Sequence, residues 1–358
     1  MKILFIVPYP LAKSPSQRFR FEQYFGILRK ANHLIRIQSF LNDHGWCILY
    51  RPGKHFSKAL SLLRGFIKRF FLLFQVPFFD FVFIHREAAP VGPPVFEWII
   101  AKIFRKKIIY DFDDAIWLTD NTNESSLIKI FRWRSKVSAV CRWSYNVSCG
   151  NQFLQAFARK YNSSTFHNPT TIDTEKNHNL DLYRKPEKGN NIVIGWTGSH
   201  STLKYLGEIE TVLQKIERDF PHVSFVVIAN QKPAIKLASL KFIPWKEETE
   251  IPDLLTLDIG LMPLPDDEWS KGKCGFKALQ YMALEIPAIA SPVGVNTKII
   301  RNSVNGFLCV SDQEWFEALA ALINDKTLRE RIGKEGRKTV VENYSVASNT
   351  EDFLKLFN

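Results

Sequence analysis

The sequence predicts an α/β protein built from two doubly wound parallel sheets. Short apolar runs bounded by polar loops alternate with helical stretches along the chain, which is typical of strand–helix–strand units. The 358 residues are more than one average domain contains. A linker is expected after FHNPTTIDT at 166–174, because Pro169 and a polar stretch to Asn191 interrupt the pattern there. We therefore expect domains at 1–170 and 171–344.

The first half is expected to begin with a buried strand, Ile3 to Val7, followed by a Pro-rich loop. Strands at 81–84 and 108–112 both end in polar residues, His85 after the first and Asp113 in YDFDDAIW after the second. Loops after parallel strands open at the ligand edge of the sheet, so both are candidate site residues. The Asp113 carboxylate can accept a hydrogen bond from a hydroxyl group and orient it for reaction. A lone histidine such as His85 is more often satisfied within the core.

Two arginines, Arg18 and Arg20, lie in SPSQRFRFEQY beyond the Pro-rich loop. Guanidinium groups at the opening of a helix suit a phosphate, a pyrophosphate or an acceptor group. The alternative is that both are ordinary surface residues. Asp114, next to Asp113, is expected to cap the following helix.

The second half is expected to start with a strand from Asn191 to Gly195, which leads into the turn GWTGSHS containing Thr197 and Gly198. A helix is expected from about Thr202, with Lys204 near its start. Further apolar runs continue the alternation expected of a doubly wound domain. They predict strands at 224–228, 240–243 and 307–310 and a helix at 313–323.

Residues 258–296 carry the clearest functional signal. They predict a strand at 259–264, a polar loop, a helix, and a second strand at 286–290. The positive N-terminus of that helix points to the ligand edge, where it suits a phosphate-bearing ligand. The candidate residues for binding this ligand lie in the loop and the helix: Lys273, Cys274, Gly275, Phe276, Lys277 and Gln280. Lys277 and Gln280 are three residues apart and therefore share one helix face, which we expect to face a cleft.

This segment resembles the retaining glycosyltransferases of the GT-B fold, in particular glycosyltransferase family four (glycosyl transferases group 1), whose string is E-G-F-G-L-x-x-L-E-A-M-A-x-G-x-P-V-I-A-S. Matched without gaps on Pro287 to Ser291, the two family acids fall on Gly272 and Gln280. The resemblance implies two Rossmann-like domains facing a central cleft, the first on the acceptor side and the second binding a nucleotide sugar. It also implies that the terminal helix at 345–358 returns to the first domain.

The resemblance implies a hexosyltransferase-type enzyme that moves a sugar from a nucleotide diphosphate donor to a hydroxyl of a glycan or lipid-linked acceptor, with retention, in polysaccharide or glycoconjugate biosynthesis. No metal or other cofactor is implied. Gln280 takes the place of the acid that binds the ribose, while Thr197 and Gly198 lie against the donor diphosphate. Lys204 matches a family lysine at that diphosphate, and Asp113 takes the place of a histidine that reaches the donor sugar. We therefore expect Asp113 and Lys204 to be catalytic.

Three alternatives remain open. D-F-D-D at 111–114 also resembles the D-x-D string of metal-dependent GT-A glycosyltransferases, whose oxygen ligands suit Mg²⁺ or Mn²⁺. That single-domain fold would leave the second strand–helix array unexplained. The missing acids at Gly272 and Gln280 are compatible with a nucleotide-sugar-binding protein of low turnover. A sugar-nucleotide epimerase of GT-B fold is the third alternative.

Charge is unevenly distributed along the chain. Residues 1–170 contain 25 Lys and Arg against 10 Asp and Glu, a net charge of +15, whereas residues 171–358 have 23 against 26, a net charge of −3. An anionic partner of the first half is implied. Residues 53–79 interleave basic and aromatic side chains, which indicates an interfacial helix on an anionic membrane surface, with Lys54, Lys58, Lys68 and Arg69 facing outward. A helix packed on the sheet is the alternative.

Nucleic acid is not an expected partner, because the sequence contains no recognisable DNA- or RNA-binding motif. The five cysteines, Cys47, Cys141, Cys149, Cys274 and Cys309, are odd in number and lack a CxxC pair, so neither a disulfide framework nor a zinc site is expected. The N-terminal apolar run is too short for a signal peptide. We expect a cytoplasmic protein, peripheral on the inner face of the membrane.

Overall fold

The computed structural model describes residues 1–49, 51, 53–119, 131–184, 186 and 189–358. They form two compact units: unit 1 comprises Met1–Thr170 with Thr350–Asn358, and unit 2 comprises Thr171–Asn349. The returning segment starts later than residue 345, where we expected it. Ser345 forms a β-bridge with Ile172, and the N–H of Val346 donates to the carbonyl of Ile172, so 345–349 stay in unit 2.

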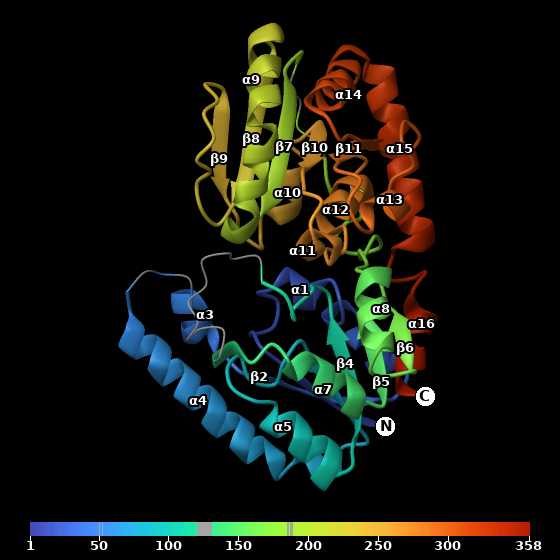
Figure 1. Cartoon of the computed structure of the whole chain (residues 1–358). Helices are drawn as coiled ribbons and strands as arrows, with labels where there is room; N and C mark the ends of the chain where they lie inside the picture. The colour runs from blue at the N-terminus through green and yellow to red at the C-terminus, as the bar shows by residue number, and fades with distance from the viewer. Residues whose placement is uncertain (50, 52, 120–130, 185, 187–188) are drawn as a thin grey trace. The chain divides into compact units, whose positions relative to one another are not determined.

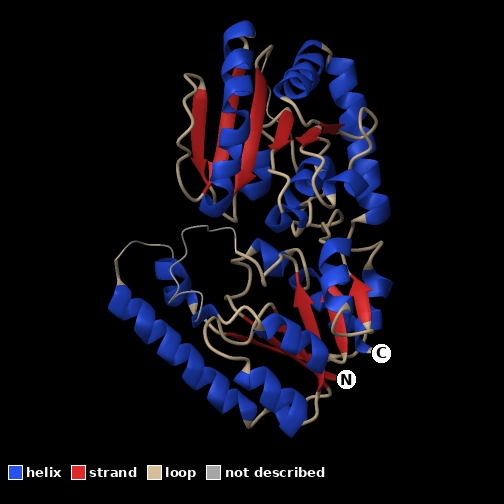
Figure 2. Ribbon diagram, viewed as in Figure 1, coloured by secondary structure: helices blue, strands red, loops and turns tan. Residues whose placement is uncertain are grey.

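Unit 1 is built on one parallel six-stranded sheet, drawn in red in Figure 2, in the order β2-β1-β3-β4-β5-β6. The chain changes direction of winding between β1 and β3, where a doubly wound sheet opens a crevice at the carboxyl ends of its strands. The strands are β1 Lys2–Val7, β2 Leu34–Ser39, β3 Phe81–His85, β4 Lys107–Phe112, β5 Asn146–Cys149 and β6 Thr165–His167.

Helices connect these strands (Figure 1). The α-helices of unit 1 are α1 Pro15–Arg18, α2 Phe25–Lys30, α3 Asp43–Leu49, α4 His55–Leu73, α5 Val95–Trp98, α7 Lys136–Trp143, α8 Gln152–Arg159 and α16 Thr350–Leu354. Short 3-10 turns are η1 Glu22–Tyr24, η2 Val76–Phe78 and η6 Lys355–Phe357, and η3 Ile99–Ile103 is a π-helical turn.

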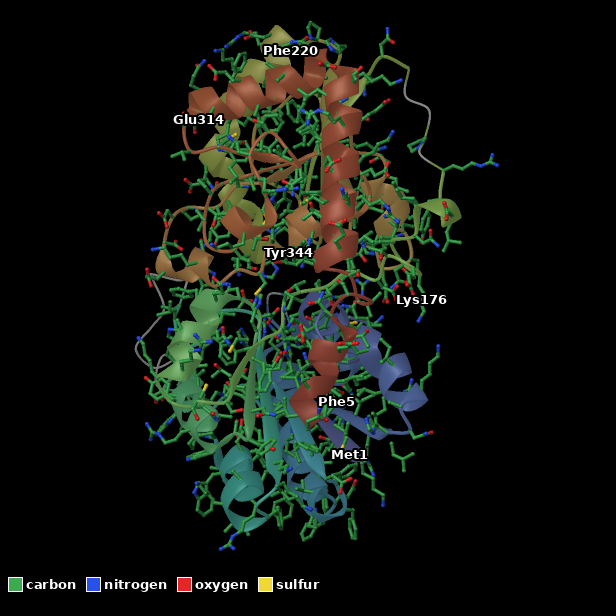
Figure 3. The ribbon with its side chains drawn as sticks, turned by 90° about the vertical axis from the view of Figure 1, so that its right-hand side faces the viewer. Met1, Phe5, Lys176, Phe220, Glu314 and Tyr344 are labelled. Carbon is green, nitrogen blue, oxygen red and sulfur yellow. The ribbon has the colours of Figure 1, made fainter. Side chains whose placement is uncertain are left out.

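The core of unit 1 is aromatic and includes the C-terminal segment. Phe5 on β1, labelled in Figure 3, packs 4.8 Å from Phe83 on β3, measured between ring centres. Phe353 of α16 stacks on Tyr24 at 4.1 Å, and Phe357 lies 5.8 Å from Phe81. Burying each such ring contributes about 1.5–3 kcal/mol, so Phe353 and Phe357 make the C-terminal segment a contributor to the core.

Unit 2 contains a second parallel six-stranded sheet in the order β12-β11-β10-β7-β8-β9. This is the strand order of nucleotide-binding Rossmann sheets, and winding reverses between β7 and β10. The strands are β7 Ile192–Gly198, β8 Val223–Ala229, β9 Leu240–Pro244, β10 Ile259–Met262, β11 Ala288–Ala290 and β12 Phe307–Leu308.

The expected helix near Thr202 proves to be a 3-10 segment, η5 His200–Ile209, which continues into α9. A second such turn is η4 Leu180–Leu182. The α-helices of unit 2 are α9 Glu210–Asp219, α10 Glu250–Leu254, α11 Glu268–Lys271, α12 Phe276–Ala283, α13 Asn296–Ile299, α14 Asp312–Asn324 and α15 Lys326–Asn343. Ser311 and Glu314 form a capping box at the start of α14, which agrees with the predicted helix at 313–323.

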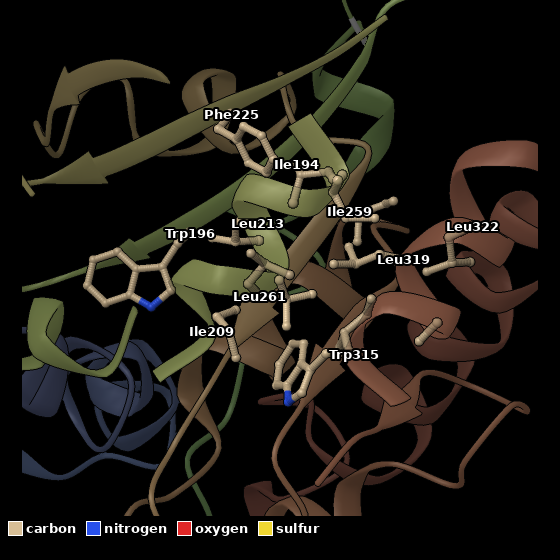
Figure 4. Packing of buried hydrophobic residues seen from close by; sticks show 14 of the residues in the cluster. Ile194, Trp196, Ile209, Leu213, Phe225, Ile259, Leu261, Trp315, Leu319 and Leu322 are labelled. Carbon is tan, nitrogen blue, oxygen red and sulfur yellow. The ribbon is translucent and has the colours of Figure 1, made fainter. Parts of the chain in front are cut away.

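The core of unit 2 lies between its sheet and the helices α9 and α14. Figure 4 shows Trp196 and Ile194 of β7 packed with Leu213 of α9, and Trp315 and Leu319 of α14 in the same cluster. β7 is therefore fixed by apolar contacts along its whole length. Its last two residues, at the carboxyl edge, are held in a rigid position from which they can serve a site.

Candidate functional site

The carboxyl ends of β7 and β10, between which the winding of the second sheet reverses, are called the crossing point here. Residues from β7 and α12 come together at this point. The N–H of Thr197 donates to the Tyr281 hydroxyl at 2.9 Å, and that hydroxyl donates to the carbonyl of Leu261 on β10. The Lys277 ammonium lies 5.2 Å from the centre of the Trp196 indole, within cation–π range. A methyl group added to Gly198 would approach Lys277 Cε to 2.8 Å. Thr197, Gly198 and Lys277 are thus neighbours.

The loop after β10 ends at Gly275, which is the N-cap of α12 and has a φ of 70°. A Cβ there would lie 2.1 Å from Ile299 Cδ1, so both the backbone angle and the close approach require glycine. Cys274 is buried beside it, while Phe276 is half-buried. Lys273 is placed over the Trp269 ring at 4.9 Å. The helix α12 therefore begins close to the crossing point, with the N–H groups of its first turn there.

Gln280 does not face a cleft as we expected. It is 1% exposed, and its Nε2 donates to Oε1 of Glu250 at 3.4 Å. The same oxygen accepts from Trp245 Nε1 at 3.2 Å. Sequence reasoning missed Glu250 and Trp245, because they lie 30 or more residues from Gln280 and follow a strand with no recognisable motif. A buried carboxylate thus accompanies the amide that replaces the family acid.

Lys204 lies on η5, where its side chain is exposed and its ammonium is 5.3 Å from the centre of the Tyr205 ring. The turn between Gly198 and this segment is fixed by the N–H of His200, which donates to Asn230 Oδ1 at 2.7 Å. Lys204 is therefore carried by a 3-10 segment and not, as we expected, by the first turn of an α-helix.

In unit 1 a buried polar network occupies the carboxyl ends of β3, β4 and β5. Nδ1 of His85 donates to Oδ2 of Asp111 at 2.8 Å, and Ser148 Oγ donates to Oδ1 of Asp111 at 2.6 Å. Arg20 forms an ion pair with Asp111 and donates to the carbonyl of Asn168. Burial would raise the pKa of Asp111, but Arg20 and the hydrogen bond from His85 hold that pKa well below its usual range.

This network involves two of the expected site residues, Arg20 and His85. Arg20 is 1% exposed and its guanidinium donors are used inside the unit, so its placement does not agree with a phosphate ligand. His85 is fully buried, and within the described residues its Nε2 has no hydrogen-bond partner and lies 4.0 Å from Oδ1 of Asp113. Arg18 is half-buried at the end of α1, with its guanidinium 5.0 Å from the centre of the Phe19 ring.

Arg86 holds both carboxylates that follow β4. Its Nε donates to Oδ1 of Asp113 at 2.8 Å and its Nη2 to Oδ2 of Asp114 at 2.6 Å. Asp114 therefore pairs with Arg86, and no helix begins in the described residues 115–119 that follow it. Arg86 has a φ of 59°, and this left-handed backbone is fixed by its N–H, which donates to the Asp111 carbonyl, and by its carbonyl, which accepts from the Tyr110 hydroxyl.

The geometry of D-F-D-D does not resemble a metal site. Asp111 points into the arginine–histidine network, and Asp113 and Asp114 both form ion pairs with Arg86. A divalent ion would have to compete with a guanidinium for each carboxylate. No group of three potential metal ligands occurs among the residues that the structure describes.

Unit 2 matches a known protein family. Residues 187–339 match the family model described as glycosyl transferases group 1. Unit 2 is therefore a group 1 glycosyltransferase domain. No curated protein matches the sequence significantly.

Solved structures that resemble this chain cover nearly its whole length at low identity. The Anabaena protein HepE, in complex with UDP and glucose, has a TM-score of 0.65 and 15% identity over 99% of this chain and 98% of its own. A glycosyltransferase from Rickettsia africae has a TM-score of 0.70 and 12% identity, over 99% of this chain and 97% of its own. Sucrose-phosphate synthase from Thermosynechococcus elongatus has a TM-score of 0.66 and 12% identity, over 99% of this chain and 98% of its own. These similarities confirm the GT-B fold.

Proposed function

We propose that this glycosyltransferase moves a sugar from a nucleoside diphosphate donor to a hydroxyl group, with retention of configuration at the anomeric carbon. The observation that carries the proposal is the convergence of Gly198, Lys277 and the N-terminus of α12 at the crossing point of the second sheet. A close backbone, an ammonium group and oriented amides are the elements that bind a diphosphate. HepE, which shares the fold, has been solved with UDP and with UDP-glucose, so a uridine donor is the first to test.

In the proposed reaction the bond between the anomeric carbon and the diphosphate oxygen breaks while the acceptor oxygen forms a bond on the same face. A donor phosphate oxygen takes the acceptor proton, and the nucleoside diphosphate leaves. Lys204, Lys273, Lys277 and the amides of Cys274, Gly275 and Phe276 stabilise its growing charge by electrostatic preorganisation. No metal is needed for this step.

Unit 2 also offers a place for the nucleoside. We propose that Glu250 contacts the ribose hydroxyls and that the buried Gln280 positions its carboxylate, since the Gln280 amide donates to Oε1 of Glu250. In unit 1, Asp113 is proposed to contact a sugar or acceptor hydroxyl. Its side chain is 13% exposed and Arg86 fixes its orientation. His85 supports Asp113 from within, and Arg18 remains a candidate for an acceptor phosphate.

The acceptor is proposed to be a glycan or a lipid-linked sugar used for cell-surface polysaccharide or glycoconjugate synthesis, with the enzyme peripheral on the inner face of the membrane. The exposed basic and aromatic surface of unit 1 supports this location. Within the described residues no helix has the length and hydrophobicity to cross a bilayer.

Donor incubation without an acceptor tests the proposal. A transferase slowly releases the nucleoside diphosphate by hydrolysis, an epimerase makes a different nucleotide sugar, and a binding protein does neither. A thermal-shift screen of UDP, GDP, ADP and CDP identifies the base, because a ligand at about 100 times its Kd stabilises the fold by about 2.7 kcal/mol. Absence of any nucleotide effect would contradict the proposal.

A further inference from the structure

The long helix α4 packs against the rest of unit 1 through a side made mainly of small or polar residues. Its buried residues are Ser61, Gly65, Arg69 and Leu72, spaced four, four and three residues apart along one stripe. Three of the four are small or polar. A helix of a soluble protein normally buries its large apolar side chains and exposes its polar ones. α4 instead buries a stripe of mainly small or polar residues and exposes several of its large apolar side chains.

Specific contacts fix this orientation. A Cβ on Gly65 would lie 2.4 Å from the Phe40 ring, so only glycine allows the helix so close. Arg69, which we expected to face outward, is 1% exposed. Its guanidinium donates to the carbonyls of Val7 at 2.7 Å, Gln38 at 2.9 Å and Ala88 at 2.7 Å. The helix cannot rotate to bury its aromatic side without breaking these bonds.

The opposite side of α4 is exposed and strongly apolar. We call it the aromatic face, formed by Phe56, Leu63, Ile67, Phe70, Phe71 and Phe74. Phe56 is 83% exposed, and the next turn, η2, adds Phe78 at 71%. Phe70 contacts Phe71 and Phe74 at ring distances of 5.8 and 5.7 Å, so the rings form one ridge. Isolated exposed apolar residues are normal, but a continuous patch marks an interaction surface.

The apolar surface extends to the neighbouring segment α5–η3. Figure 1 shows α5 beside α4, and Phe66 of α4 contacts Phe96 of α5 at a ring distance of 6.1 Å. Val95, Trp98 and Ile103 of this segment are also exposed. The patch is therefore wider than the single helix that the sequence indicated.

The charged side chains of α4 and of its N-cap Lys54 are all positive. Lys54, Arg64 and Lys68 are exposed and Lys58 is half-buried. No Asp or Glu occurs between Asp43 and Asp80. Two copies of this face would bring like charges together, whereas an anionic surface would complement them. Apolar rings in the middle of lysines and arginines are the composition of helices that lie in the headgroup region of a bilayer.

We propose that α4, η2 and α5 form a docking surface for an anionic lipid bilayer. The helix lies parallel to the membrane plane, the rings of the aromatic face enter the boundary between headgroups and acyl chains, and the basic residues contact lipid phosphates. This inference deepens the peripheral location proposed above and does not depend on which sugar or nucleotide the enzyme uses.

Co-sedimentation with vesicles tests the docking surface on the full-length protein. Wild type should bind vesicles of phosphatidylcholine and phosphatidylglycerol, and less as salt rises. The variant Phe70→Ser, Phe71→Ser, Phe74→Ser should lose roughly a hundredfold in partitioning, since three rings leave the interface. Lys54→Gln with Lys68→Gln should lose about twentyfold and show a weaker salt dependence.

Matched controls come from unit 2. Lys334→Gln with Lys338→Gln removes two exposed lysines, and Val310→Ser removes an exposed apolar side chain, so both should bind vesicles like wild type. A nucleotide thermal shift on every variant shows that the fold and the donor site are intact, which separates failure of this surface from failure of the proposed function.

Two outcomes would overturn the docking surface. One is equal vesicle binding by the serine variant and wild type. The other is an absence of binding to anionic vesicles combined with a wild-type dimer that the serine variant converts to monomer. That second result would assign the aromatic face to another copy of the chain.

Discussion

Gly198 and Lys277 are in such close contact that a single methyl group on the glycine would displace the lysine. The added Cβ would lie 2.5 Å from the Trp196 ring and 2.8 Å from Lys277 Cε. Since Lys277 also stacks over that indole, the three residues form one unit of structure at the crossing point. Its sensitivity to one methyl group is the sharpest test of the donor site.

Gly198→Ala is therefore expected to weaken nucleoside diphosphate binding by about tenfold or more, because moving one well-placed group costs at least about 1.4 kcal/mol. Gly207→Ala on η5 is the control, since nothing lies within 4 Å of the added methyl. Isothermal titration with UDP measures both. Equal affinities of the two variants would place the diphosphate elsewhere.

Lys204→Ala and Lys277→Ala are each expected to lower the rate of sugar transfer by about a hundredfold or more, because removing one donor to developing charge typically costs about 2.7–4 kcal/mol. Lys334→Ala, an exposed lysine on α15, should have no effect. Steady-state release of nucleoside diphosphate gives the rates. If Lys204→Ala stays within about threefold of wild type while Lys277→Ala does not, the crossing point alone holds the diphosphate.

EDTA is expected to leave the transfer rate unchanged. The carboxylates of Asp113 and Asp114 are paired with Arg86, and Asp111 is paired with Arg20, so none is arranged to bind a divalent ion. The assay compares enzyme with and without chelator, and with added Mg²⁺ or Mn²⁺. Loss of activity that either ion restores would revive the metal-dependent alternative.

Asp111→Asn is expected to destabilise unit 1 by about 3–5 kcal/mol at pH 7, because it leaves Arg20 buried without its counter-charge. The pKa of Asp111 is lowered in the folded state, so its contribution is complete above the unfolded pKa of about 4 and is lost as the pH falls further. The difference between the variant and wild type should therefore shrink below pH 4.

Urea unfolding at several pH values measures this difference. The control is Glu330→Gln, which removes an exposed ion pair with Lys326 and should change stability by less than about 1 kcal/mol at any pH. A difference for Asp111→Asn that stays constant down to pH 3 would mean that the pKa of Asp111 is not lowered in the fold.

Of the five cysteines, Cys47 alone is exposed, and the other four are buried. Burial raises the pKa of Cys141 and of Cys309 to about 12, which further suppresses their thiolates. Ellman's reagent should therefore modify one thiol rapidly in the native protein and the rest only after unfolding, and Cys47→Ser should abolish the rapid phase. Rapid labelling of Cys274 would show that the loop before α12 opens.

The fold was largely predictable because apolar strands and intervening helices recur along the chain. β1, β7, β10 and α14 lie where the runs at 3–7, 191–195, 259–264 and 313–323 predicted them. The 3-10 conformation of η5 was not predictable, since its residues have ordinary helical periodicity. The burial of Arg69 was missed for a related reason: periodicity shows that a helix has two sides, but not which side the protein takes.

The candidate site was predictable only where residues are close in sequence. Thr197, Gly198 and the residues from Lys273 to Lys277 follow strands, and the structure places them at one crossing point. Asp111, Arg86, Glu250 and Tyr281 were missed as site components because each acts on a partner 20 or more residues away. Such pairs depend on strand order, which no local pattern contains.

The C-terminal segment affects how the protein can be made. Phe353 and Phe357 complete the core of unit 1, yet the ribosome adds them only after the whole of unit 2. During synthesis the first 170 residues must wait with Phe81, Phe83 and Tyr24 uncovered, while unit 2 already has its complete sequence. Domains usually fold in the order in which they emerge. Here the second to emerge is the first that can be finished.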